Sequence, residues 1–351
     1  MWLNKLTQLM KLSILLALSI LLISCEAVTY YSQAVRGQLA LNLGRENIQQ
    51  LLEDKNLPHN LREKFIEVNK IREFAEIELG LPIGGNYATY VDLGREYVVW
   101  NVFAAPEFST EPMNWCYPIA GCVSYRGYFS ESSAMRFAEK LRGKGLDVYV
   151  AGISAYSTLG WFDDSVLNTV VDRSSDQLAS LIFHELAHQV IYIPGDTDFN
   201  ESFATAVERE GLRRWLQAKG QDNNLGVGEE NLKRHKQFVE LIISYRDQFD
   251  SLYEKDIADH LKREQKAEIQ VSLRNEFSIM ENKWGDYGRY DAWFSGDLNN
   301  AQLSTVVSYN TLVPFFTKIL DESDDITMFY AEVEKLAELD EAERRERVKA
   351  N

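Results

Sequence analysis

The chain of 351 residues is poor in cysteine and proline, with 3 Cys and 7 Pro. So few cysteines exclude a small scaffold held together by disulfides, and 12% aromatic residues with little proline exclude a disordered chain. Basic residues are also scarce, because 37 Lys and Arg stand against 53 Asp and Glu, a net charge of −16. Such a surface repels phosphate backbones, so we expect no nucleic acid among the partners.

Long apolar runs are absent except near the start of the chain. An apolar segment at 12–23 follows Lys5 and Lys11, and it is shorter than the about 20 residues that a membrane-spanning helix needs. A positive region followed by a short apolar region is typical of a secretory signal, which we place at residues 1–24. An uncleaved anchor helix is the alternative.

The end of this segment, Leu-Ile-Ser-Cys, resembles a bacterial lipobox. The resemblance implies that Cys25 is acylated and becomes the first mature residue, so the protein contacts the membrane through this lipid anchor. We therefore expect a protein of the bacterial cell envelope that faces the periplasm. Glu26 follows the cysteine in place of the aspartate associated with retention in the inner membrane, which favours the outer membrane.

The mature chain shows no repeat and no linker, so we predict one domain over residues 25–351. Apolar residues recur at helical spacing over 27–80, in a first stripe of Val28, Tyr31, Val35, Leu39 and Leu43 and a second of Leu61, Phe65, Val68, Ile71, Phe74 and Ile77. Leu57-Pro58 separates the two helices. Residues 88–129 are rich in β-formers, a helix is expected at 132–142 and a strand at LDVYVAG.

From Ser174 onward the pattern is mostly helical. Two highly charged stretches, 254–277 and 336–351, are predicted to be solvated helices. The predicted fold class is therefore α+β and predominantly helical. Its parts are a helical N-terminal collar at 25–85, a small sheet region at 86–165 and a helical catalytic region at 166–351.

Two cysteines, Cys116 and Cys122, remain in the mature chain. An oxidising compartment permits a small disulfide loop between them, and two buried thiols fit the sequence nearly as well. The separation of their Cα atoms decides between these possibilities.

The segment SSDQLASLIFHELAHQVIYIPG predicts a buried helix that carries chemistry. Ser174 and Gln177 form a capping-box pattern, and Pro194-Gly195 ends the helix. The helix is apolar on most sides, so His184 and His188 lie in the interior, four residues apart on one face. This is the H-E-x-x-H pattern, in which two histidines bind zinc and the glutamate, here Glu185, acts as general base. The alternative is two core histidines bonded to backbone carbonyls.

A catalytic zinc ion has three protein ligands and one open position. The third ligand is expected from NESFATAVE, where Glu201 follows His188 after a gap that contains the Pro-Gly turn. Glu208 shares a helix face with Glu201 and is predicted to accept the second N–H of a ligand histidine. In the alternative, Glu201 is a capping-box residue with Asp198, and Glu208 is an exposed acid. The other histidines, His59, His235 and His260, are expected to be solvated.

These motifs resemble those of the gluzincin metallopeptidases. HELAHQ followed by NESFATAVE is similar to the zincin aminopeptidase pattern H-E-L-x-H then N-E-G-F-A with a further Glu, although Ser202 replaces the usual Gly and the gap is shorter. The chain also resembles a bacterial family called putative aminopeptidases, through the lipobox and through YYSQAVRGQL, YRGYF, SAYSTLGWF and NNAQL with Tyr309 and Pro314. The resemblance implies a zincin-like fold and one Zn²⁺ per chain.

The resemblance also implies a mechanism, in which Glu185 takes a proton from water and delivers it to the leaving amine. Related zincins place a Tyr or His to stabilise the oxyanion. Tyr309 is the first candidate here and Tyr290 and Tyr287 come next, although all three could simply pack. The stretch 154–160 stands where zincins have an edge strand that pairs with substrate, with a plain turn as the alternative.

The function expected from the sequence is zinc-dependent hydrolysis of peptide bonds, in an aminopeptidase with peptide substrates. An aminopeptidase requires an acid for the substrate ammonium, and Asp163, Asp164 and Glu210 are all available. The alternatives are a zinc endopeptidase that acts on envelope proteins and a lipoprotein with a zincin-like fold used only for binding. A binding protein has no use for Glu185, which argues against the last.

Overall fold

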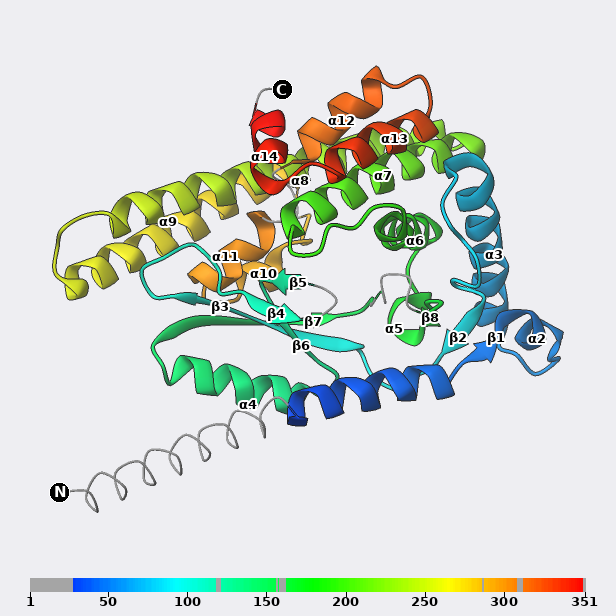
Figure 1. Cartoon of the computed structure of the whole chain (residues 1–351), viewed down its shortest axis with the longest axis horizontal. Coiled ribbons are helices and arrows are strands. Elements are labelled where there is room, and N and C mark those ends of the chain that lie inside the picture. Colours follow the sequence, from blue (N-terminus) through cyan, green and yellow to red (C-terminus); the bar gives the residue numbers. More distant parts are fainter. Residues whose placement is uncertain are drawn as a thin grey trace, which may run out of the picture.

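The structure is a computed structural model that describes residues 28–117, 121–155, 157, 162–285, 287–307 and 312–349 (Figure 1). It is α+β and predominantly helical, as predicted. No helix within the described ranges is both long and apolar enough to cross a bilayer. Tyr309 and Cys25 both lie outside the described residues.

A three-stranded antiparallel sheet in the order β6-β3-β7 forms the middle of the molecule. Its strands are β3 (Val99–Pro106), β6 (Arg126–Tyr128) and β7 (Leu146–Ile153). The β3–β7 pairing covers eight residues, from Val99 opposite Ile153 to Pro106 opposite Leu146. Helix α4 (Glu131–Arg142) covers one face through Ala134 and Ala138. The helix expected at 132–142 and the LDVYVAG strand are therefore present.

Two smaller β structures flank this sheet. Strands β1 (Glu46–Asn47), β2 (Thr89–Val91) and β8 (Val166–Leu167) form a mixed sheet in the order β1-β2-β8. Strands β4 (Trp115–Tyr117) and β5 (Gly121–Val123) form a hairpin in which Cys116 and Cys122 stand opposite each other and form a disulfide. The structure thus decides for the disulfide where the sequence left two possibilities open.

The N-terminal collar contains a helix at 28–43, then α2 (Ile48–Glu53) and α3 (His59–Leu79). Helix α3 begins directly after the Leu57-Pro58 break, as predicted, but its buried face is Phe65, Val68, Ile71, Ala75 and Leu79. Ile77, placed on this stripe from the sequence, is 68% exposed. The predicted stripe leaves the buried face because each step of three residues falls about 60° short of a full turn of 3.6 residues.

The largest hydrophobic cluster joins α3 to the helices that follow the sheets. These are α5 (Asn168–Val171), α6 (Ser175–Val190), α7 (Thr197–Ala218), α12 (Val313–Glu322) and α13 (Ile326–Ala337). A second cluster lies in the long helices α8 (Asp222–Tyr253) and α9 (Asp259–Trp284) with α10 (Asp291–Phe294) and α11 (Asn300–Val307). The chain ends in α14 (Glu341–Lys349).

The two charged stretches predicted as solvated helices are more buried than their composition indicates. In α9, Lys266 is buried and its Nζ lies 2.7 Å from Asp147 Oδ2 on β7. In α14, Arg344 is buried, with its Nη2 2.9 Å from Asp196 Oδ2. A buried cation needs a partner of opposite charge, and in both cases the partner lies on a distant element.

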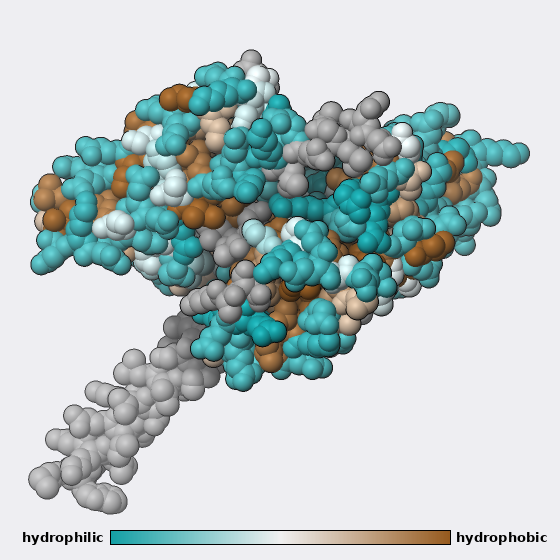
Figure 2. Space-filling model, turned by 90° about the horizontal axis from the view of Figure 1, so that it is seen from above, coloured by the Kyte–Doolittle hydropathy of each residue, from teal (hydrophilic) through white to brown (hydrophobic). Residues whose placement is uncertain are grey.

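Seen from above, the surface is mostly hydrophilic, with separate hydrophobic patches (Figure 2).

Candidate metal centre

The capping box at the start of α6 forms as predicted. Ser174 Oγ accepts the Gln177 N–H at 3.3 Å, and the Gln177 side chain accepts the Ser174 N–H at 3.1 Å. The helix then buries Leu178, Ile182 and Leu186. His184 and His188, one turn apart, are therefore held on a helix whose position is fixed by its apolar neighbours.

The turn between α6 and α7 is closed by the asparagine of the NESFA motif. Asn200 Nδ2 donates to the Ile193 carbonyl and Asn200 Oδ1 accepts the Ile193 N–H, both at 2.8 Å. Gly195 in this turn has φ 90, a conformation that glycine adopts without strain. Asp196 caps α7 by accepting the Phe199 N–H, so the helix begins three residues before Asn200 and Asp198 is not its cap.

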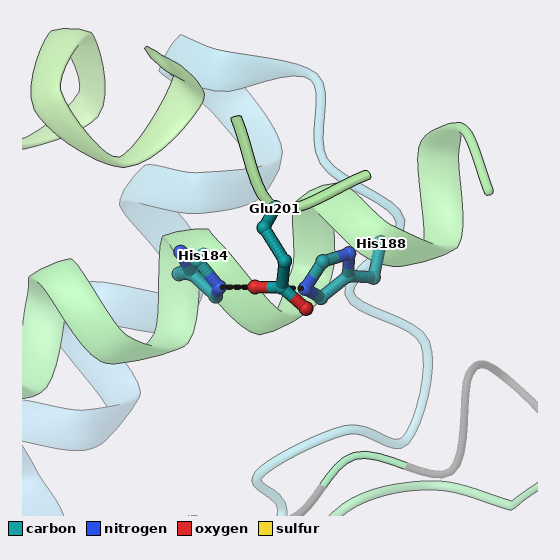
Figure 3. A group of neighbouring side chains, drawn as sticks. All are labelled: His184, His188 and Glu201. Atoms are coloured by element: carbon teal, nitrogen blue, oxygen red, sulfur yellow. Dashed lines mark ion pairs between the residues drawn. The ribbon is translucent and has the colours of Figure 1, made fainter. Parts of the chain in front are cut away.

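Glu201 points between the two histidines (Figure 3). Its Oε2 lies 3.4 Å from His184 Nε2 and 3.8 Å from His188 Nε2. One ligand atom from each of the three side chains lies within 4.8 Å of the other two. The three predicted metal ligands therefore meet at one point between α6 and α7.

The donor set fits a zinc ion. Ligand atoms about 2.1 Å from a tetrahedral ion are about 3.4 Å apart, close to the separations of Glu201 Oε2 from the imidazole nitrogens. Two imidazoles and one carboxylate are also a known catalytic zinc set. Glu208 Oε2 lies 3.2 Å from His184 Nδ1, the position predicted for a group that orients the ligand ring. His188 Nδ1 is buried and has no hydrogen-bond partner among the described residues.

Burial and charge affect the pKa values of the three side chains at the centre differently. Burial lowers the pKa of His188 to about 4, so this ring is neutral near pH 7. Burial alone would raise the pKa of Glu201, but its hydrogen bond with His184 holds the pKa below its ordinary value. Burial likewise opposes a charge on His184, yet the hydrogen bonds with Glu201 and Glu208 hold its pKa well above 6.5. Glu201 is therefore ionised and available as an anionic ligand.

Glu185 stands beside this centre in a different environment. Burial raises the pKa of its carboxyl to about 7, and the negative charges of Glu201 and Asp164 add to the effect. Burial lowers the pKa of Arg173, and the negative charges of nearby Glu185 and Glu208 offset only part of this effect. A carboxyl group with a pKa near neutrality can both accept and release a proton at pH 7.

A loop before β2 contacts α6, the helix that carries His184 and His188, which the sequence analysis did not anticipate. The side-chain amide of Asn86 pairs with that of Gln189, the residue after His188, at 3.1 and 3.2 Å. Tyr87 is buried with φ 57, an unusual conformation for a bulky residue, and its N–H donates to the Asp164 carbonyl at 2.6 Å. In the sequence, the Gly-Gly-Asn-Tyr run and the Gln that ends HELAHQ are the features from which this contact could have been predicted.

Of the three tyrosines predicted as candidates to stabilise the oxyanion, the structure describes two. Tyr309, the first candidate, lies outside the described residues. Tyr290 stacks on Phe238 with ring centroids 4.0 Å apart, and its hydroxyl lies 2.9 Å from His235 Nδ1. Tyr287 lies under the Arg234 guanidinium at 4.8 Å. Tyr290 and Tyr287 therefore pack, and His235 is bonded rather than solvated, whereas His59 and His260 are exposed as expected.

A tyrosine that the sequence analysis did not consider lies closer to the centre. The Tyr192 ring is 6.4 Å from the His188 ring, and the charge of Glu201 adds to the effect of burial in raising the pKa of its hydroxyl. Tyr192 lies just beyond α6, which ends at Val190, so the extended residues after the helix bring its ring towards His188.

The three acids considered for the substrate ammonium lie in different surroundings. Glu210 accepts hydrogen bonds from Arg213 and Arg214 at 2.7 Å, so its charge is already neutralised. Asp163 lies against Gly85. Asp164 is buried, acts electrostatically on Glu185 and accepts the Ser157 hydroxyl at 2.9 Å. Part of the predicted substrate-pairing stretch, Tyr156 and 158–160, lies outside the described residues.

Comparison with known proteins identifies a family for the chain. No match is found among curated proteins, and none among solved structures. The model of a family described as putative aminopeptidase matches residues 29–348, which include both motifs of the metal centre. Because the match covers nearly the whole described chain, the protein belongs to this putative aminopeptidase family.

Proposed function

We propose that the protein is a gluzincin-type zinc metallopeptidase with a zincin-like catalytic region, and most specifically an aminopeptidase. The observation that carries the proposal is the meeting of His184 Nε2, His188 Nε2 and Glu201 Oε2 beside the buried carboxyl of Glu185. Membership of the putative aminopeptidase family supports hydrolysis of peptides from the amino end. The two-histidine, one-carboxylate donor set favours zinc over calcium or magnesium, which prefer all-oxygen sites.

His184, His188 and Glu201 would hold the ion. Zinc bound there would supply Lewis acidity to the scissile carbonyl and to the attacking water. Glu185 takes a proton from that water as the new carbon–oxygen bond forms, and its pKa of about 7 suits this step. The same carboxylic acid then gives the proton to the amine nitrogen as the carbon–nitrogen bond breaks. Glu208 accepts the Nδ1 proton of His184 and keeps Nε2 directed at the ion.

The location follows from the start of the chain. We propose that residues 1–24 are a secretory signal and that Cys25 carries the lipid that tethers the enzyme to the envelope, facing the periplasm and in the outer membrane. The disulfide between Cys116 and Cys122 supports an oxidising compartment.

The replacement Glu185→Gln tests the mechanism. The amide cannot accept the proton from water, so kcat is expected to fall by about 10² to 10⁴ while one zinc per chain is retained. Exposed Glu73 on α3 provides the matched control, and Glu73→Gln should leave both kcat and zinc content unchanged. Zinc is measured by atomic emission and kcat with an aminoacyl amide. Near wild-type turnover in the zinc-loaded Glu185→Gln protein would contradict the role of Glu185.

A pair of peptides that differ only at the amino terminus tests the aminopeptidase assignment. A free peptide should be shortened from its amino end, and its acetylated copy should resist cleavage, because an exopeptidase recognises the ammonium group. Mass spectrometry identifies the products. Equal cleavage of both peptides at internal bonds would instead establish the endopeptidase alternative.

A further inference from the structure

A continuous apolar stripe runs along the exposed side of the helix at 28–43. Five of the 13 large apolar side chains that are exposed among the described residues lie on it. The stripe consists of Val28, Tyr31, Val35, Leu39 and Leu43, which are 64%, 45%, 65%, 52% and 78% exposed. Their spacing of three or four residues places them on one face, about 22 Å long. The sequence predicted the helix from this spacing, and the structure leaves the apolar face exposed.

The opposite face of the same helix is fixed to the sheet region. The Arg126 guanidinium lies 4.1 Å over the Tyr30 ring, and the Phe129 N–H donates to Gln33 Oε1 at 2.9 Å. A Cβ at Gly37 would lie 2.0 Å from the Phe129 ring, so only glycine permits this approach. The helix is therefore docked in one orientation, and the apolar stripe faces outward because of these contacts.

Basic side chains gather beside the stripe although the chain as a whole has a net charge of −16. Residues 27–45 contain no acid and include exposed Arg36. Helix α4 lies along the same edge of the molecule (Figure 1). On α4 and the turn after it, four exposed cations outnumber two exposed acids: Arg136, Lys140, Arg142 and Lys144 against Glu131 and Glu139.

We infer that this edge, the stripe together with the α4 cations, lies on the surface of an anionic lipid bilayer. The inference rests on the proposed acylation of Cys25, which is three residues before the described helix and would place its start at the membrane. An interfacial helix buries its apolar face below the headgroups while neighbouring cations attract anionic lipid. Tyr31 has the amphipathic ring that is favoured at this depth.

A second copy of the chain fits this edge less well than a bilayer does. A symmetric dimer through the stripe would bring the basic α4 residues of one copy towards the same residues of the other, and like charges oppose such an association. An anionic bilayer instead offers acyl chains to the apolar stripe and negative headgroups to the cations.

Contact of this edge with the bilayer also fixes the direction in which the metal centre faces. Helices α6 and α7 lie on the other side of the β6-β3-β7 sheet from α4 and the 28–43 helix (Figure 1). The metal centre would then face away from the bilayer, so its substrates would be peptides in the periplasm rather than segments embedded in lipid.

A fluorescent label at Val35 tests whether the apolar stripe contacts the bilayer. With Cys25 acylated and Cys116 and Cys122 joined, Val35→Cys introduces the only free thiol, at a position where no buried contact is lost. The full lipidated protein, labelled with an environment-sensitive dye, is reconstituted in vesicles of equal parts phosphatidylcholine and phosphatidylglycerol. The matched control is Ile279→Cys on α9, which is 59% exposed and lies on a different face.

Brominated lipids are expected to quench roughly half or more of the Val35 signal and little of the Ile279 signal. Quenching at Val35 should also weaken on pure phosphatidylcholine and in the Arg136→Glu, Lys140→Glu background. Equal, weak quenching at both positions in anchored protein would overturn the inference. Shielding of Val35 from aqueous iodide without lipid quenching would assign the stripe to a contact with a second copy of the chain, which also overturns the inference.

Acylation of Cys25 and peptidase activity are each measured separately from the contact with the bilayer. Mass spectrometry of the mature amino terminus reports acylation at Cys25. Peptidase activity of Val35→Cys should equal that of the wild type, because the label is not near the metal centre. Loss of lipid quenching with intact acylation and activity would therefore reject the contact of the stripe with the bilayer. It would leave the lipid anchor and the proposed function standing.

Discussion

At the scale of single residues, His184 shows how the centre is ordered. Its two ring nitrogens each face a carboxylate, Glu201 at 3.4 Å and Glu208 at 3.2 Å. One carboxylate belongs to the proposed ligand set and the other orients the ring, so the two glutamates of α7 have different tasks although both contact the same imidazole. Their seven-residue spacing gives two helical turns, which is why one helix can serve both nitrogens.

Replacement of Glu208 is expected to weaken zinc binding without removing a ligand. Glu208→Ala should lower the affinity about 10- to 100-fold, because the His184 ring loses the acceptor that fixes its orientation. Glu208→Gln, which keeps an acceptor oxygen, should lose less. Competition with a chromophoric chelator measures the affinity, with Glu210→Ala as the control on the same helix. Wild-type affinity in Glu208→Ala would show that the contact does not orient the ligand.

At the scale of elements, the pairing of α6 with α7 determines the site. Contacts between the two helices run in opposite order along the chain, from His188 with Glu201 to Phe183 with Gly211. The absent side chain at Gly211 allows the close approach, because a Cβ there would lie 2.7 Å from the Phe183 ring and 2.8 Å from Leu79. Close packing of this kind tolerates little added volume.

The replacement Gly211→Val is expected to separate the two helices. Overpacking should lower the free energy of unfolding by about 1–3 kcal/mol, and the displaced Glu201 should bind zinc less tightly. Urea denaturation and zinc titration measure the two effects. Gly143→Val at the exposed end of α4, where the nearest atom to a Cβ is 3.4 Å away, provides the control. Unchanged stability together with unchanged zinc affinity would show that α6 and α7 can adjust.

At the scale of the whole molecule, the metal centre lies on the largest hydrophobic cluster, which includes α3, α6, α7, α12 and α13. Arg344 of the last helix binds Asp196, the cap of α7, so the end of the chain also braces the centre. An ion that binds only the folded form therefore stabilises the whole cluster. The assignment of residues 25–351 to one domain stays a prediction.

Removal of zinc is expected to lower the thermal stability of the protein. An ion present at 100 times its Kd contributes about 2.7 kcal/mol, so chelation should lower Tm by several degrees and added zinc should restore it. Calorimetry with and without chelator measures the shift. Glu185→Gln should show the same shift, and His188→Ala should show almost none. A chelator-independent Tm in the active enzyme would argue against a bound ion at this centre.

The pattern of the sequence was sufficient for features that depend on neighbours along the chain. The capping box of α6, the four-residue spacing of its histidines and the Pro-Gly turn before Glu201 are local, and helix geometry converts such spacing directly into a shared face. The meeting of His184, His188 and Glu201 and the predominantly helical α+β class could therefore be predicted, whereas the binding of zinc stays a prediction.

Tertiary structure alone decided which surfaces meet. Asn86 reaches Gln189 across about a hundred residues of chain, and Lys266 finds Asp147 on a strand. The apolar stripe from Val28 to Leu43 is exposed because Tyr30 and Gly37, on the other face of its helix, contact the sheet region. Periodicity reports that a face is apolar, but whether protein, solvent or lipid covers it depends on packing between distant segments, which spacing along the chain does not encode.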